Sequence, residues 1–415
     1  MFYGCPCGSR NFLFLGGLEV AEKRTTAANA LIWLGAAISI AEIYTGTLMA
    51  PLGMAQGMLA VFLGHAAGGV LMYLTALIGG RTSCGAMESA GMFFGGGGAK
   101  FFAALNVLQL VGWTAVMIAG GAISLGIFLN PATGLNNAVW CAAIGVMIAI
   151  WIMLDMKNFE RVNRAAMTAL FLLTLLLSYI TFGGKGAGAA SGTLSFAEAI
   201  ELSAAMPLSW LPLISDYMRD AEDPGKSAAI STVIYSIASC WMYFIGMGAA
   251  IYAGSSDVAE IMKNAGMSAA GIVIIIFSTV TTTFLDAYSA GISFHVIFPQ
   301  IREKAAGVAV CAAGTFIAVF ANAENYEGLL YLRSSVFAPM AAVMITDYFL
   351  LGEKSFSDRR TSLRNLAVWA AGFAFYRYLM NTGCPIGATA PVIAATAVLA
   401  WAAGKIFPCA KSAEM

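Results

Sequence analysis

Polar and small residues interrupt one long apolar stretch of the chain, Asn29 to Gly53. About 20 apolar residues are enough to cross a bilayer as a helix, so this stretch can span a membrane. Glu42 lies within it, and a carboxylate at the bilayer centre costs roughly 2.5–3.5 kcal/mol or more, so it normally faces a cavity or a partner. Gly35, Ser39 and Gly46 would let the helix open and expose carbonyl groups, which is tolerated at that depth only beside a cavity or protein. The stretch predicts a broken helix that binds a ligand at mid-membrane. A helix with a polar packing face is the alternative.

A second set of polar residues lies in the apolar segment 101–129. Gln109 and Trp113 are four residues apart, so they share one face of a helix. A flat indole beside an amide suits a flat heterocycle that forms hydrogen bonds. The alternative is a Trp packed in the bundle and a Gln bonded to a neighbouring helix.

A third set is the run STVTTTFLD, from Ser278 to Asp286, in the segment 269–296. Hydroxyl and carbonyl oxygens are hard ligands that suit a small cation. Thr282 and Asp286 lie on one face of the expected helix. Hydrogen bonding between helices is the alternative explanation for a Thr cluster in a membrane.

The composition indicates a helical protein that crosses a membrane many times. Of 415 residues, 60% are hydrophobic and 11% are charged, whereas a soluble domain carries about 25% charged residues. The net charge is zero, so nothing suggests nucleic acid as a partner. His65 and His295 form no metal pattern, and no nucleophile–base pair supports an enzyme. The pair Cys5 and Cys7 is on its own a weak signal for a metal.

Twelve apolar segments can be recognised in the sequence. They are 29–53, 56–79, 101–129, 137–154, 165–182, 197–218, 227–253, 269–296, 305–321, 326–351, 364–380 and 387–407. With twelve crossings, most Lys and Arg residues between segments fall on one side, which predicts that both termini are cytoplasmic. The glycine-rich segment from Met87 to Gly98 is expected to lie along the cytoplasmic interface.

The sixth segment contains Pro207 and Pro212, which both remove backbone hydrogen bonds within a helix. The first and sixth segments are thus the interrupted ones, at corresponding places in two halves of five segments each. Paired broken helices in inverted repeats indicate a transporter's binding site. Chance is the alternative, since Pro and Gly are frequent in membrane helices.

Four stretches carry a resemblance to a known family. They are LIWLGAAISIAEIYTGTLMAPLG at 31–53, NVLQLVGWTAVMI at 106–118, SWLPLISDYMRD at 209–220 and AYSAGISF at 287–294. The chain resembles the nucleobase–cation symporters of the cytosine/purine permease type. Within them it is most similar to transporters assigned to hydroxymethylpyrimidine in thiamine precursor uptake.

This resemblance implies an all-α integral membrane protein of twelve helices, with broken helices one and six. The implied parts are a cytoplasmic N-terminal segment 1–28, a first five-helix repeat 29–182, an external linker 183–196, a second five-helix repeat 197–351, and two extra helices with a cytoplasmic tail, 352–415.

The resemblance also implies two sites. The sodium ligands would be carbonyl groups of Gly35, Ile38 and Ser278 and the hydroxyls of Thr281 and Thr282. The substrate-binding residues would be Trp113, Gln109, Ser39, Glu42, Ser209, Trp210 and Thr283, with Trp113 as the stacking platform. Trp210 stands one turn beyond the family's second aromatic position. Glu42 replaces a neutral small residue of the cytosine permeases and would contact an amine, pair with Arg333 or carry a proton.

The sequence therefore predicts a secondary active transporter in the plasma (inner) membrane. It would import a pyrimidine, of hydroxymethylpyrimidine or cytosine type, by sodium symport with alternating access, and it would need no enzymatic cofactor. Its partners would be the pyrimidine, sodium and the lipid bilayer. The main alternative is a proton-coupled cytosine/purine permease with Glu42 or Asp286 titrating. A channel or a membrane enzyme is a further alternative.

Overall fold

The computed structural model describes most of the chain. The described residues are 23–154, 156–183, 193–253, 257–264, 266–320, 326–354, 361–382, 384 and 387–407. Within these ranges the chain is helical apart from its turns and one isolated bridge between Arg24 and Ala221. Cys5, Cys7 and residues 184–192 of the external linker lie outside the described residues, so the expectations for them stay predictions.

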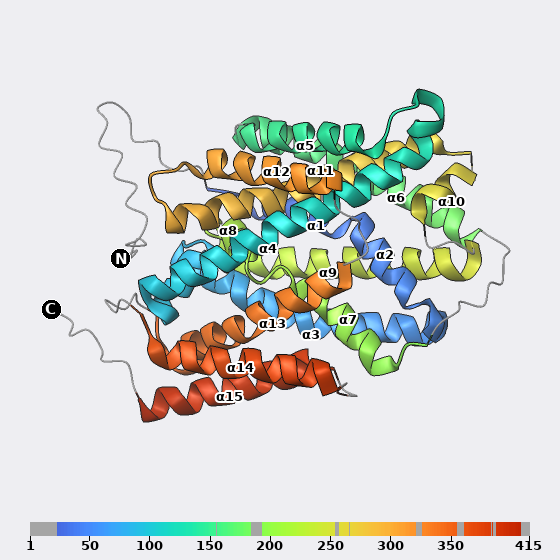
Figure 1. Cartoon of the computed structure of the whole chain (residues 1–415). Coiled ribbons are helices and arrows are strands. Elements are labelled where there is room, and N and C mark those ends of the chain that lie inside the picture. Colours follow the sequence, from blue (N-terminus) through green and yellow to red (C-terminus); the bar gives the residue numbers. More distant parts are fainter. Residues whose placement is uncertain are drawn as a thin grey trace, which may run out of the picture.

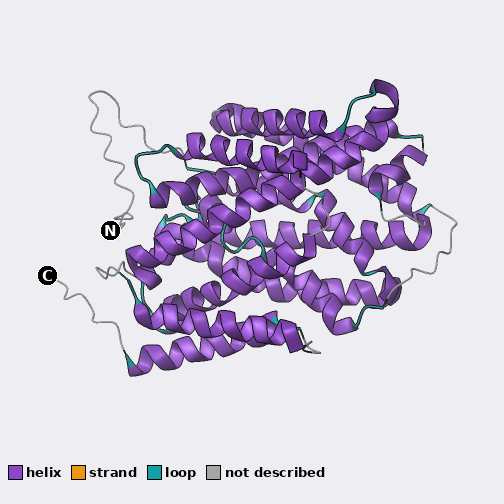
Figure 2. Ribbon diagram, in the orientation of Figure 1, coloured by secondary structure: helices purple, strands orange, loops and turns teal. Residues whose placement is uncertain are grey.

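The helices form one elongated bundle (Figures 1 and 2). In chain order they are α1 Thr26–Ala37, α2 Ile40–Leu48, α3 Gly53–Thr82, α4 Ala86–Thr133, α5 Asn137–Met153, α6 Met156–Phe182, α7 Phe196–Leu208, α8 Ile214–Met218, α9 Pro224–Gly248, α10 Val258–Asn264, α11 Ser268–Ile297, α12 Glu303–Phe320, α13 Tyr326–Ile345, α14 Leu363–Thr382 and α15 Thr389–Ile406. A single 3₁₀ turn, Ala50–Leu52, precedes α3, and short π-helical turns, Ala249–Ala253 and Thr346–Leu350, extend α9 and α13.

Each of the twelve predicted segments falls on one helix or on a broken pair of helices. The first segment is α1 and α2, which meet at an angle of 49°. The sixth is α7 and α8, separated by a turn from Ser209 to Leu213. In the described part of the chain, eight helices are long and apolar enough to cross a membrane, and the pair α1–α2 makes a ninth. The all-helical membrane fold with a broken first helix is confirmed.

The helices of the first half of the chain pack against those of the second half in a reciprocal way. α1 and α2 pack against α9, while α7 packs against α3, and α4 packs against α11. A two-fold relation between the halves would exchange the first segment with the sixth, the second with the seventh and the third with the eighth. The observed neighbours are those that this relation requires, whereas the number of membrane crossings and the inverted orientation stay predictions.

Glycines bring both broken helices close to their partners. A Cβ atom at Gly46 of α2 would meet the backbone of Tyr243 in α9, and one at Gly246 would meet the backbone of Ile43. Gly64 of α3 lies equally close to Ser203 of α7. Small residues allow such contacts between membrane helices. Each broken helix is therefore in close backbone contact with the helix that follows its counterpart.

The glycine-rich segment from Met87 to Gly98 is helical and bent. It forms the first part of α4 and bends at Gly95, where φ is 74°, a conformation that favours glycine. Phe93 and Phe94 are buried together with side chains of α13 and α14. Its apolar side chains thus find partners in the bundle, and its place along the cytoplasmic interface stays a prediction.

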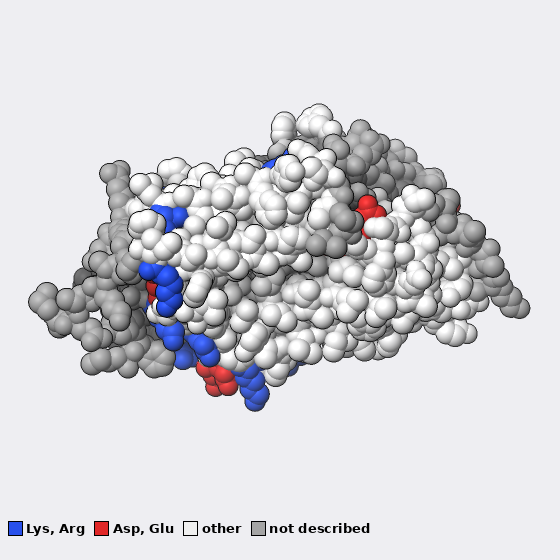
Figure 3. Space-filling model, turned by 90° about the horizontal axis from the view of Figure 1, so that it is seen from below, with Lys and Arg blue, Asp and Glu red and all other residues white. Residues whose placement is uncertain are grey.

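Charge is distributed unevenly over the surface. Figure 3 shows basic side chains gathered toward one end of the visible face, the end at which α15 finishes in Figure 1. Such an asymmetry is what the positive-inside rule leads one to expect of a membrane protein. The assignment of that end to the cytoplasm stays a prediction.

Candidate substrate and cation sites

The break between α1 and α2 releases backbone carbonyl groups. In a continuous helix, the N–H groups of Ser39 and Ile40 would donate to the carbonyls of Gly35 and Ala36. Instead, the Ser39 N–H donates to a carbonyl only two residues back, at 3.0 Å, and the Ile40 N–H donates to the Ser278 hydroxyl of α11, at 3.2 Å. The two carbonyls thus lose their regular donors at the C-terminal end of α1, where the helix dipole favours a cation.

The facing part of α11 offers hydroxyl oxygens. Thr281 donates to the Phe277 carbonyl at 2.6 Å, which leaves its own oxygen able to accept. The buried Thr282 hydroxyl makes no hydrogen bond within the described part of the chain. Because Ser278 bonds directly to the break, the structure brings together the two segments on which the sodium ligands were predicted. Carbonyl and hydroxyl oxygens are ligands that fit a small hard cation.

The predicted substrate platform lies on α4. Trp113 is buried. The Gln109 side chain donates to the Asn106 side chain at 2.7 Å, while its buried carbonyl oxygen has no partner among the described residues. Asn106 in turn donates to the Pro212 carbonyl at 3.2 Å and to Ser293 at 2.9 Å. This arrangement fixes the orientation of Gln109 and leaves one acceptor for a ligand.

Arg333 of α13 is a site residue that the sequence analysis named only as a partner for Glu42. It is 2% exposed, and its guanidinium carbon lies 5.2 Å from the centre of the Trp113 ring. It also donates to the Ser209 carbonyl in the turn between α7 and α8. Its charge attracts the buried carboxylate of Asp286, whose oxygens make no hydrogen bond within the described ranges. A cation inside an apolar segment was the signal for this role.

Glu42 lies in the first turn of α2, where the Ser39 hydroxyl accepts a hydrogen bond from its N–H at 3.2 Å. One carboxylate oxygen accepts from the Tyr235 hydroxyl at 2.9 Å and the other from Ser239 at 2.7 Å. The alternative that Glu42 pairs with Arg333 is wrong, because the partners of its carboxylate are hydroxyls of α9 and it makes no ion pair within the described residues. Tyr235 and Ser239 carried no signal in the sequence. The role of Glu42 as a substrate contact stays a prediction.

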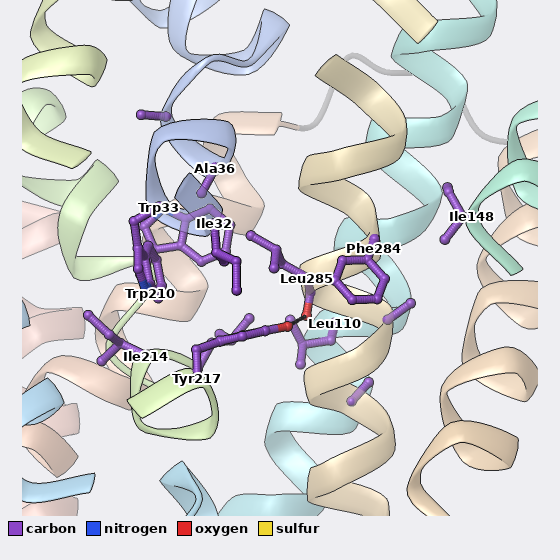
Figure 4. Packing of buried hydrophobic residues seen from close by; sticks show 14 of the residues in the cluster. Ile32, Trp33, Ala36, Leu110, Ile148, Trp210, Ile214, Tyr217, Phe284 and Leu285 are labelled. Carbon is purple, nitrogen blue, oxygen red and sulfur yellow. Dashed lines mark hydrogen bonds between the residues drawn. The ribbon is translucent and has the colours of Figure 1, made fainter. Parts of the chain in front are cut away.

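Trp210 lies in the turn between α7 and α8 and packs against α1. Its ring meets Trp33 edge-on, with 5.4 Å between the ring centres (Figure 4). Its indole N–H donates to Tyr235 at 2.8 Å. Trp113 belongs to a different cluster of buried side chains. The expectation that Trp210 is a second stacking partner stays a prediction, as do the roles of Ser39, Ser209 and Thr283.

Polar contacts tie α8, at one end of the bundle, to its neighbours. The Tyr217 hydroxyl donates to the Leu285 carbonyl of α11 at 2.8 Å (Figure 4). Arg219, which follows α8, forms a two-pronged ion pair with Glu303 of α12, at 3.1 and 2.8 Å. Burial on its own lowers the pKa of Arg219, but the charge of Glu303 outweighs it and holds the pKa well above its usual value. These contacts hold α8 and the residue after it against α11 and α12.

Comparisons with known proteins agree with this architecture. A family model described as permeases for cytosine/purines, uracil, thiamine and allantoin matches residues 19–413. The chain belongs to this permease family. It is thus a multi-pass membrane transporter rather than an enzyme, as the sequence predicted. A comparison with curated proteins finds no match.

Solved transporters share the fold. Mhp1, a nucleobase-cation-symport-1 family transporter in a closed conformation with bromovinylhydantoin bound, is 19% identical, with a TM-score of 0.79 over 94% of this chain and 95% of that one. The inward-facing conformation of Mhp1 is 18% identical, with a TM-score of 0.76 over 93% and 91%. A Na⁺-coupled sialic acid symporter in an outward-open state is 12% identical, with a TM-score of 0.69 over 95% and 92%. These likenesses show the fold of a secondary transporter.

Proposed function

We propose that this permease imports a pyrimidine, of hydroxymethylpyrimidine or cytosine type, together with sodium across the plasma (inner) membrane, with both termini in the cytoplasm. The family description names cytosine and uracil among the substrates of its members. Binding of the ion and the substrate would shift the equilibrium between outward-open and inward-open states. Each ligand would then tighten the binding of the other by the same factor.

The observation that carries the sodium proposal is the pair of carbonyls released at Gly35 and Ala36. Buried carbonyl groups are almost always bonded, so an opening in the helix requires another partner for them. The hydroxyls of Thr281 and Thr282 lie on the helix that bonds to this opening through Ser278. A sodium ion held by these groups and by the Ile38 and Ser278 carbonyls would compensate the break.

The pyrimidine would stack on Trp113. The free carbonyl oxygen of Gln109 would accept a hydrogen bond from a ring or exocyclic N–H group, which cytosine and aminopyrimidines both carry. Because the Arg333 guanidinium lies over the Trp113 ring, a stacked substrate would replace it there or bind the opposite face. Thr283, whose buried hydroxyl makes no bond within the described residues, would supply a further contact.

Uptake into vesicles tests this proposal. Purified protein in proteoliposomes is given labelled hydroxymethylpyrimidine or cytosine, with a sodium gradient and a proton gradient imposed separately. The proposal expects accumulation of at least one pyrimidine that follows the sodium gradient. Uptake that ignores sodium would refute the coupling, and failure to move either pyrimidine would refute the substrate class.

A further inference from the structure

A continuous chain of hydrogen bonds joins two ionisable side chains inside the bundle, Glu42 of α2 and His65 of α3. The Ser239 hydroxyl of α9 lies 2.7 Å from a Glu42 carboxylate oxygen and 2.6 Å from His65 Nε2. On the other side of the imidazole ring, Nδ1 lies 2.8 Å from the Ser203 hydroxyl of α7. All four side chains are at most 1% exposed. In this conformation the groups are therefore shielded from bulk water.

Hydrogen-bond rules place a proton on His65 Nδ1. The Ser203 hydroxyl donates its single proton to the Val61 carbonyl, at 2.8 Å, so its oxygen can only accept from the ring. His65 Nδ1 also lies 3.1 Å from that carbonyl, which is an acceptor and never a donor. Both neighbours of Nδ1 are therefore satisfied when Nδ1 carries a hydrogen.

The contacts on the other side of the ring require one more proton. Ser239 has a single hydroxyl proton, so it donates to one of its two neighbours and accepts from the other. In one arrangement, neutral Glu42 donates to Ser239, which donates to Nε2 of neutral His65. In the other, ionised Glu42 accepts from Ser239, which accepts from the Nε2–H of a charged imidazolium. The two arrangements hold the same number of protons and differ only in the direction of two hydrogen bonds.

We propose that the Glu42–Ser239–His65 chain is a binding site for one exchangeable proton, which this transporter binds in addition to its coupling sodium. Loss of that proton leaves a carboxylate and a neutral imidazole whose Nε2–H donates to Ser239. Nδ1 then has no hydrogen, and the Ser203 hydroxyl must turn from Val61 toward the ring. Deprotonation thus changes contacts at both ends of the chain.

The ends of this chain lie on the two broken helices. Glu42 is on α2, the second half of the first broken helix, and Ser203 is on α7, the first half of the other. Proton occupancy therefore favours one set of contacts among α2, α3, α7 and α9. A ligand that prefers one arrangement of these helices shifts the equilibrium toward it. The site is independent of which compound the protein carries.

Within the described residues, no Lys or Arg forms an ion pair with Glu42 that would hold it ionised. Its remaining oxygen accepts a hydrogen bond from the Tyr235 hydroxyl. The Tyr243 ring packs edge-on to the His65 ring, with 5.1 Å between the ring centres. The buried titratable or charged groups on the helices packed around Glu42 and His65 include Tyr235, Cys240 and Tyr243 of α9, Glu201 of α7, bonded to Thr389 and Tyr376, Asp216 of α8, bonded to Ala86 and Ser289, and Arg333 of α13, bonded to Ser209. α11, which also packs against α2, carries the buried Asp286.

Infrared spectroscopy of the full-length protein in lipid membranes tests the proposal without a substrate. A protonated carboxyl group has a C=O stretching band that disappears as the group ionises. We expect a pH-dependent band of this kind that is absent from Glu42→Gln. In Ser239→Ala its midpoint should shift by roughly one pH unit, the effect of about one hydrogen bond. Ser239→Thr, which keeps the hydroxyl, should restore the midpoint.

Ser231→Ala is the matched control, since it removes a buried hydroxyl from α9 that makes no hydrogen bond within the described part. It should leave the midpoint unchanged. Identical titrations of the native protein and Glu42→Gln would overturn the proposal. If Glu42→Gln does not fold, an unchanged midpoint in Ser239→Ala overturns it instead. Neither result depends on pyrimidine or sodium transport, so the proposed function can fail separately.

Discussion

The backbone carbonyl groups at the two helix breaks differ in their hydrogen-bond donors. At the first break, the N–H groups of Ser39 and Ile40 turn away and leave the carbonyls of Gly35 and Ala36 without their regular donors. At the second break, side chains from other helices donate hydrogen bonds to the carbonyl groups. Arg333 donates to the Ser209 carbonyl, and Asn106 donates to that of Pro212.

This difference assigns different tasks to the two breaks. The carbonyl oxygens of Ser209 and Pro212 already have hydrogen-bond donors, and these bonds hold the turn between α7 and α8 in a fixed position. Carbonyls without donors can be satisfied by an ion. The first break is therefore suited to the cation, and the second is suited to hold one side of the substrate site.

The largest effect is expected from Arg333→Ala at the second break. Breaking a buried ion pair costs about 3–5 kcal/mol, which is an upper bound here because Arg333 acts on the buried carboxylate of Asp286 without a direct ion pair within the described residues. Thermal unfolding in detergent should show a strong loss of stability. Arg333→Ala combined with Asp286→Asn should recover part of it, and a double variant no more stable than Arg333→Ala would contradict the attraction between the two charges.

A smaller effect is expected at the platform beside the second break. Stacking of a base on an aromatic side chain contributes about 1–3 kcal/mol. Trp113→Ala should therefore weaken pyrimidine binding about 5- to 150-fold, at 1.4 kcal/mol per factor of ten. Equilibrium binding of labelled hydroxymethylpyrimidine or cytosine measures this. Trp401→Ala, at an exposed position on α15, should bind normally, and normal binding by Trp113→Ala would leave α4 as scaffold only.

The smallest effect is expected from Ser278→Ala at the first break. Without the Ser278 hydroxyl, the Ile40 N–H can return to the Ala36 carbonyl and close the opening. One hydrogen bond contributes about 1 kcal/mol, so sodium affinity should fall about fivefold. Sodium titration of substrate binding measures the change, with Thr279→Val on the same helix as a control. Equal affinities in Ser278→Ala and the native protein would show that this bond does not hold the break open.

The sequence predicted the fold better than it predicted the side-chain contacts. Long apolar segments and the interruptions at Ser39 and Pro212 are local signals, so the helices and both breaks could be placed from them. The partners of Glu42 could not, because Tyr235 and Ser239 are ordinary helix residues almost 200 positions away. Arg333 was visible as an intramembrane cation, yet its position over Trp113 depends on how α13 packs.

The claim that the first break holds the coupling ion has one direct test. The double variant Thr281→Val and Thr282→Val keeps the shape of both side chains and removes both hydroxyl ligands. Substrate binding is measured with and without sodium, in this variant and in Thr279→Val. We expect the double variant to lose its sodium dependence and Thr279→Val to retain it. Unchanged sodium stimulation in the double variant would show that the ion binds elsewhere.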